Sequence, residues 1–154
     1  LVRYVRENYN LVIGESTAEE IKINIGSANP NYSAKYEVKG RDLMTGLPRH
    51  IELSAEETHK AFKELLDNVA HAARRVLEKT PPELSADIVE KGIILTGGGS
   101  LLEGIDKFIS DRTEVGAFVT DDPLICVAEG TGQALNELDK ISNVLSTGDQ
   151  GILS

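Results

Sequence analysis

Three consecutive glycines are the strongest chemical signal in the sequence. Gly97, Gly98 and Gly99 directly follow a short apolar run at residues 92–96 and precede Ser100. Because glycine has no side chain, the backbone N–H groups of such a loop can approach a phosphate, a ribose or the edge of a base. The spacing matches neither the dinucleotide-binding glycine pattern nor the phosphate loop of NTPases. A tight strand-to-helix turn with no ligand therefore stands as an equal alternative.

A carboxylate and an ammonium group form the second candidate. Glu19 and Lys22 are three residues apart in a predicted helix, so they share one face of it. Together they could hold ribose hydroxyls and the edge of a base. From the residues alone, a solvated surface ion pair worth ~0.5 kcal/mol or less is the favoured interpretation.

Other catalytic or metal-binding patterns are not visible in the sequence. His50, His59 and His71 are far apart, without cysteines or carboxylates at ligand spacing, and His59 and His71 are predicted to be surface residues. Cys126 is the only cysteine; its apolar surroundings predict a buried, inert thiol in a reducing compartment. The sequence thus predicts no metal ligand and no catalytic residue.

The composition is that of an acidic globular protein. Apolar residues make up 40% and charged residues 27% of the 154 residues, which is close to the globular average. A formal net charge of −9 argues against nucleic-acid binding and against electrostatic docking on anionic lipid. No apolar run approaches the ~20 residues needed to span a bilayer.

Helices and a strand pair are predicted in the part of the chain that carries Glu19 and Lys22. Residues 1–9 have helical spacing, and a second helix, capped by Ser16 or Thr17, is expected to end at Gly26. Residues 34–38 and 49–53 alternate like two antiparallel strands, with turns predicted at residues 40–42 and 45–48. Ser54 and Glu57 form a capping-box signature that opens a long helix, which must end before Pro81.

The second part of the chain is predicted to build the glycine loop into a strand–loop–helix–strand unit. Residues 84–89 are expected to form a short helical turn, and residues 92–96 a strand. A helix is expected to start at Ser100, a second strand to cover residues 117–120, and a last helix to cover residues 124–145 before a polar tail. Parallel pairing of the two strands is favoured. The predicted fold class is α/β, with a mixed helical and antiparallel part over residues 1–75 and a β-α-β-α part over residues 76–154.

Several segments, taken in order, resemble a known family. They are Tyr9-Asn10-Leu11, Ile13-Gly14-Glu15, Thr17-Ala18-Glu19, Gly40-Arg41-Asp42-Leu43, Thr45-Gly46-Leu47-Pro48, Thr80-Pro81-Pro82-Glu83-Leu84, the stretch from Leu95 to Leu102, and Asp122-Pro123-Leu124. Over roughly residues 2–140 the chain resembles the MreB/Mbl family of bacterial actin-like cell-shape proteins. The Thr-Gly-Leu-Pro and Thr-Pro-Pro-Glu-Leu segments are quite specific, whereas the glycine loop is shared across the actin and Hsp70-like superfamily.

The resemblance implies a fold, a ligand and a role. The chain would be the second lobe of an actin-like fold, with residues 1–75 as the outer subdomain and residues 76–154 as an inner subdomain that lacks its first strands. Family members are ATP-dependent filament formers beneath the cytoplasmic membrane that organise peptidoglycan synthesis and maintain rod shape. By position, Glu19 and Lys22 fall beside the adenosine of ATP or ADP. Gly97, Gly98 and Gly99 line its other side, with Ser100 and Leu101 next to them.

The resemblance also implies what this segment does not carry. The chain begins without Met, and the family's phosphate loops and water-positioning acid precede the matching segment, so we expect a fragment. We expect it to bind nucleotide weakly and not to hydrolyse ATP alone, since Mg²⁺ binding also depends on the other lobe. Expected partners are further copies of the protein and a membrane-anchored cell-shape adaptor. The expected location is cytoplasmic, with membrane association only through other segments.

Two alternatives stay open at this point. The first is another ATPase of the same superfold, a sugar kinase or a chaperone, because fold alone does not separate these activities. The second is a non-enzymatic domain that uses its acidic surface to bind a protein partner. The family-specific segments favour the filament protein.

Overall fold

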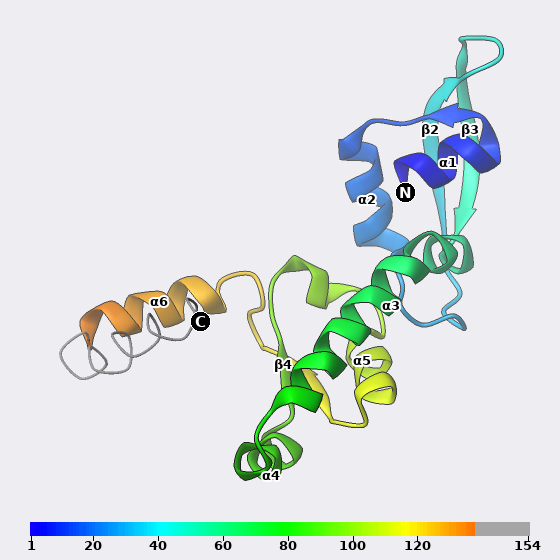
Figure 1. Ribbon diagram of the computed structural model, residues 1–154. Coiled ribbons are helices and arrows are strands. Elements are labelled where there is room, and N and C mark those ends of the chain that lie inside the picture. Colours follow the sequence, from blue (N-terminus) through cyan, green and yellow to red (C-terminus); the bar gives the residue numbers. More distant parts are fainter. Residues whose placement is uncertain (138–154) are drawn as a thin grey trace, which may run out of the picture.

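A long helix, α3 (Ala55–Lys79), links two groups of elements in the computed structural model, which describes residues 1–137 (Figure 1). The first group holds α1 (Val2–Tyr9), β1 (Leu11–Val12), α2 (Glu15–Ile25), β2 (Lys35–Asp42) and β3 (Pro48–Ser54). The second holds α4 (Pro82–Lys91), β4 (Ile93–Leu95), the 3₁₀ helix η1 (Gly98–Leu101), α5 (Ile105–Thr113) and β5 (Ala117–Val119). The last helix, α6 (Cys126–Asn136), extends to one side of the second group.

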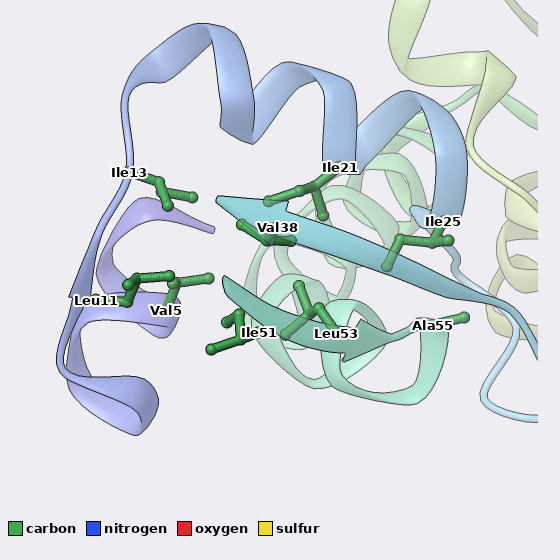
Figure 2. Close-up of a cluster of buried hydrophobic side chains, with 9 residues drawn as sticks. All are labelled: Val5, Leu11, Ile13, Ile21, Ile25, Val38, Ile51, Leu53 and Ala55. Atoms are coloured by element: carbon green, nitrogen blue, oxygen red, sulfur yellow. The ribbon is translucent and has the colours of Figure 1, made fainter. Parts of the chain in front are cut away.

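The first group is built on a three-stranded antiparallel sheet in the order β1-β2-β3. Val38 pairs with Ile51 in its register, and Tyr36 pairs with Leu53. Figure 2 shows Val38, Ile51 and Leu53 on the sheet, with Ile21 and Ile25 of α2 and Val5 of α1 among the side chains gathered around them. The predicted antiparallel pair is confirmed, although residues 40–42, predicted as a turn, belong to β2.

Of the predicted helix caps in this part of the chain, the cap of α3 is present and the cap of α2 is not. Ser54 caps α3 as predicted: its hydroxyl accepts a hydrogen bond from the Glu57 amide, and the Glu57 carboxylate accepts one from the Ser54 amide. The prediction that Ser16 or Thr17 caps α2 is wrong, because α2 begins at Glu15 after Gly14 and has no side-chain cap. The end of α2 before Gly26 is confirmed.

One carboxylate organises the tip of the β2–β3 hairpin. Asp42 Oδ1 accepts hydrogen bonds from the amides of Met44 and Thr45, both at 2.9 Å, and Asp42 Oδ2 lies 2.9 Å from Arg49 Nη1. Hydrogen bonds from the Thr45 amide, the Arg49 guanidinium and the Met44 amide lower the pKa of Asp42 to about 2. The hairpin tip is thus stabilised by the ionised form of Asp42.

We expect this carboxylate to make the free energy of unfolding depend on pH. Because the folded pKa lies below the ordinary value of 3.8, its contribution is present above pH ~4 and is lost as the pH falls through about 2. Urea unfolding between pH 5 and pH 2 checks this by comparison with Asp42→Asn. The variant should be less stable at pH 5, and the difference should shrink on acidification; a difference that stays constant would contradict the assignment.

The second group contains the other core. Leu66 and Ala70 of α3 pack with Ala28, Ile105, Ile109 and Ala117. β4 and β5 pair in parallel, as predicted, with Ile93 opposite Ala117. The short helical turn predicted at residues 84–89 is a ten-residue helix, α4. The predicted last helix over residues 124–145 is α6 as far as residue 136, and residues 138–154 lie outside the described residues.

The described helices and the histidines His50 and His59 bear on membrane crossing and on surface exposure. Of the helices within residues 1–137, none combines the length and the apolar character that crossing a membrane would need. His50 Nδ1 lies 3.0 Å from Glu37 Oε1. The prediction that His59 is a surface residue is wrong: His59 is half-buried and its Nδ1 is buried without a hydrogen-bond partner.

Candidate functional site

The acidic and basic candidates lie together on α2. Lys22 Nζ is 2.6 Å from Glu19 Oε1, and the two side chains are 37% and 56% exposed. Ile21 and Ile25 anchor the helix because both are buried against the sheet. An ion pair this exposed adds little to stability, so its charges remain available to a ligand.

The glycine loop leaves β4 with its backbone open to solvent. Gly97 has φ 81°, a conformation that favours glycine, and Gly98–Leu101 form η1. A Cβ atom added at Gly97 or Gly99 would have no neighbour within 4 Å, whereas at Gly98 it would lie 3.5 Å from Leu124 Cδ2. The loop therefore offers open backbone at Gly97 and Gly99 and is backed by Leu124.

The prediction that Ser100 starts an α-helix is wrong. Ser100 lies inside η1, its hydroxyl donates to the Gly97 carbonyl at 2.7 Å, and α5 begins only at Ile105. The intervening Gly104 adopts φ 72° and packs against Asn29, which keeps residues 102–104 out of a helix. Ser100 thus closes the turn with its hydroxyl, while Leu101 is 59% exposed.

A second segment holds the loop from behind. The Gly97 amide donates to the Pro123 carbonyl at 2.6 Å, and the Thr96 hydroxyl donates to the same oxygen at 3.2 Å. Cys126 Sγ lies 2.8 Å from Thr96 Oγ1. The prediction of a buried thiol is therefore wrong, because Cys126 is half-buried and contacts the residue that leads into the loop.

A backbone junction joins α2 to the glycine loop. Residues 26–28 and 102–104, here called the clasp, are linked by a parallel bridge between Ser27 and Glu103. The Ala28 amide donates to the Glu103 carbonyl at 2.7 Å, and the Glu103 amide donates to the Gly26 carbonyl at 3.4 Å. The Gly26 amide in turn donates to the Lys22 carbonyl at 2.9 Å, and the Leu102 amide donates to the Gly99 carbonyl at 3.3 Å. Lys22 is thus hydrogen-bonded to Gly26 on one side of the clasp, and Gly99 is hydrogen-bonded to Leu102 on the other side.

Two hollows lie away from the candidate residues. One hollow of about 450 Å³ is lined by α6 residues from Gly130 to Asn136 and by Glu137, and another of about 410 Å³ by residues of α3 from Lys60 to His71. Neither includes a candidate site residue. Within residues 1–137, no group of three or more His, Cys, Asp or Glu side chains could hold a metal ion.

The contributions of the clasp and of residues 123–126 were not predicted. Gly26, Ser27 and Ala28 form a run of small residues directly after a helix, which is a signal of close backbone approach. Nothing in the sequence indicates that Glu103, 76 residues later, is their partner. The pairing of Thr96 with Cys126 likewise joins residues 30 positions apart.

The comparisons with known proteins agree on one family. Residues 1–143 match the MreB/Mbl protein family. The cell shape-determining protein Mbl of Bacillus cereus is 46% identical over 142 residues, which cover 92% of this chain and 43% of that protein. The chain therefore spans less than half the length of this relative.

Solved structures share the fold. MreB5 of Spiroplasma citri bound to AMPPNP superposes with a TM-score of 0.83 at 35% identity, covering 92% of this chain and 43% of that one. The same protein bound to ADP gives a TM-score of 0.84 at 34% identity, with 92% and 44% covered. The MamK double helical filament, at 19% identity and a TM-score of 0.64, covers 79% of this chain and 37% of its own, and supports the actin-like fold alone. With helices, sheet, glycine loop and family match in agreement, the chain belongs to the MreB/Mbl family of cell shape-determining, actin-like proteins.

Proposed function

We propose that this chain supplies the adenosine-binding side of the nucleotide cleft in an ATP-binding, actin-like filament protein that maintains cell shape. Glu19 and Lys22 would contact the ribose and the base from one side. Gly97, Gly98 and Gly99 would line the other side, with Ser100 closing the turn and Leu101 exposed beside it. ATP or ADP is the proposed ligand, supported by the two nucleotide-bound structures of MreB5.

The clasp is the single observation that supports this proposal best. The two candidate elements are separated by about 75 residues in sequence, yet hydrogen bonds through Gly26 and Glu103 join the end of α2 to the end of η1. A surface ion pair and a tight turn with no shared role would need no such connection. The open backbone at Gly97 and Gly99 adds a place for a ligand to approach.

The subdomain assignment belongs to the same proposal. Residues 1–75 would be the outer subdomain and residues 76–154 the inner β-α-β-α subdomain of the second actin-like lobe. The two hydrophobic clusters support two units, with α3 contributing Ala55 to the first cluster and Leu66 and Ala70 to the second. The second cluster thus draws on residues before position 75.

Filament formation and cell-wall organisation are proposed for the whole protein. Family membership supports them, as does an exposed apolar hairpin tip at Leu43, Met44 and Leu47. Organisation of peptidoglycan synthesis through a membrane-anchored adaptor rests on family membership alone. These features favour a filament subunit over a sugar kinase or chaperone.

Replacing Lys22 tests the ligand assignment. We expect ADP to bind the chain weakly, with a Kd roughly in the millimolar range, and Lys22→Ala to weaken binding roughly tenfold, because a charged hydrogen-bond donor is lost. Lys60→Ala is the matched control, since Lys60 also forms an exposed helical ion pair, 2.8 Å from Glu56 Oε1. Isothermal titration calorimetry would contradict the proposal if both variants bound ADP equally well, or if the unaltered chain bound none.

A further inference from the structure

Three polar side chains are buried among the described residues: Thr58 on α3, Ser27 in the clasp and Ser100 in η1. Ser27 and Thr58 are completely buried, and Ser100 is 7% exposed. The Thr58 hydroxyl lies 2.7 Å from the carbonyl of Ile25, at the end of α2. The Ser100 hydroxyl donates to Gly97 at the start of the loop. Ser27 lies between them in the clasp.

The Ser27 hydroxyl makes its shorter hydrogen bonds to Asn29, just after the clasp, and a longer contact across the clasp to Glu103. It lies 2.9 Å from the Asn29 carbonyl and 3.4 Å from the Glu103 carbonyl, and it accepts a hydrogen bond from the Asn29 amide at 2.9 Å. Burying a hydroxyl stabilises a fold only when its hydrogen bonds are made. Ser27 therefore favours the one arrangement of residues 26–28 and 102–104 in which these bonds form. Removing the hydroxyl would leave the Asn29 amide without this acceptor.

The clasp also has no room for adjustment on the side of α2. A Cβ atom added at Gly26 would lie 2.3 Å from the Lys22 carbonyl oxygen and 2.8 Å from Leu102 Cδ1. The Lys22 carbonyl and the Leu102 side chain therefore both lie close to Gly26, which leaves no space for a side chain at this position.

We propose that Ser27 is a positioning residue that fixes the distance between the two sides of the nucleotide site. The hydroxyl fixes residues 27–29 through its bonds to Asn29, and so places the Ala28 amide that donates to the Glu103 carbonyl. Glu103 is followed back along the chain by Leu102, whose amide donates to Gly99 of η1. Loss of the hydroxyl loosens both sides together, because each is one hydrogen bond from the clasp. The consequence for ADP binding rests on the proposed function, whereas the mechanical coupling of the two segments does not.

Hydrogen–deuterium exchange without nucleotide tests the coupling. Ser27→Ala should raise exchange both in peptides covering residues 19–26 and in peptides covering residues 97–103. Ser110→Ala is the matched control: its hydroxyl also bridges two elements, donating to the Asp106 carbonyl and accepting from the Ala117 amide, both at 2.8 Å, but it lies outside the clasp. The control should leave both segments unchanged. A rise in only one segment, in neither, or equally in the control would overturn the coupling.

ADP affinity tests the positioning role in a way that a general loss of stability would not reproduce. Ser27→Ala should weaken ADP binding roughly tenfold and Ser110→Ala less than about twofold. In a Lys22→Ala background, Ser27→Ala should cause no further loss, because its effect acts through the placement of Lys22 relative to the loop. Additive losses would overturn the positioning role. Coupled exchange in a chain that binds no ADP would uphold the mechanical link and overturn the nucleotide assignment.

Discussion

Replacing Gly26 with alanine is expected to lower the free energy of unfolding by about 3 kcal/mol. Gly26 is buried with φ −66°, so alanine could adopt its backbone conformation, and the cost comes from space alone. The added methyl group would overlap the Lys22 carbonyl oxygen and Leu102 Cδ1. One of these contacts is backbone, which cannot move away as the end of a flexible side chain could. The last turn of α2 must therefore shift relative to Gly26.

Gly14 provides the matched control, because it flanks the other end of the same helix. It has φ −81°, and an added Cβ would meet only Ser16 Oγ, at 3.9 Å. Gly14→Ala should therefore be neutral or slightly stabilising, since alanine restricts the unfolded chain. Thermal unfolding should show a Tm about 6–12 °C lower for Gly26→Ala and little change for Gly14→Ala. Equal Tm values would show that the clasp is looser than described.

Leu53→Ala is expected to have a comparable effect in the first core. Leu53 is completely buried on β3, opposite Tyr36, and is surrounded by side chains from α1, α2 and β2 (Figure 2). Truncation removes the transfer free energy of the side chain and leaves a cavity, which together cost about 3 kcal/mol. The variant should unfold at a correspondingly lower urea concentration.

Leu47→Ala is the control for this prediction. Leu47 precedes the same strand but is 64% exposed, so its truncation should change the free energy of unfolding by less than ~0.5 kcal/mol. Similar urea midpoints for the two variants would contradict the placement of the core under this sheet. A change in the slope of the urea transition for Leu53→Ala would indicate instead that two-state unfolding had been lost.

The sequence predicted those elements whose causes are local. The capping box of Ser54 and Glu57, the C-terminal ends of α1 and α2, and the antiparallel strands all follow from residues within a few positions of one another. Binary alternation sufficed for the hairpin because one face packs on the core. The family resemblance, which depends on short ordered segments, was also visible without coordinates and is confirmed.

The sequence did not predict what depends on distant partners. Ser100 has the residue type of a helix start, but residues 102–104 pair with residues 26–28, and this pairing delays α5 until Ile105. Cys126 is in an apolar run, yet the turn at Pro123 brings it beside Thr96. Both errors have the same origin: local propensity was overridden by a contact that joins residues far apart in the chain.

The site itself was predicted only as two separate candidates. The residues identified Glu19 with Lys22 and the three glycines, and the resemblance joined them as two sides of an adenosine site. The structure adds the clasp, which no residue pattern indicated, as a physical link between the helix and the loop. The convergence of the two side-chain surfaces on one nucleoside stays a proposal.

An ADP titration followed by two-dimensional ¹H–¹⁵N NMR tests that convergence most directly. The proposal predicts that the amide signals of residues 19–22 and those of residues 97–101 shift together, with one common Kd, while the hairpin tip at residues 42–47 stays unchanged. Shifts confined to one of the two segments, or centred on the hollows along α3 and α6, would contradict it.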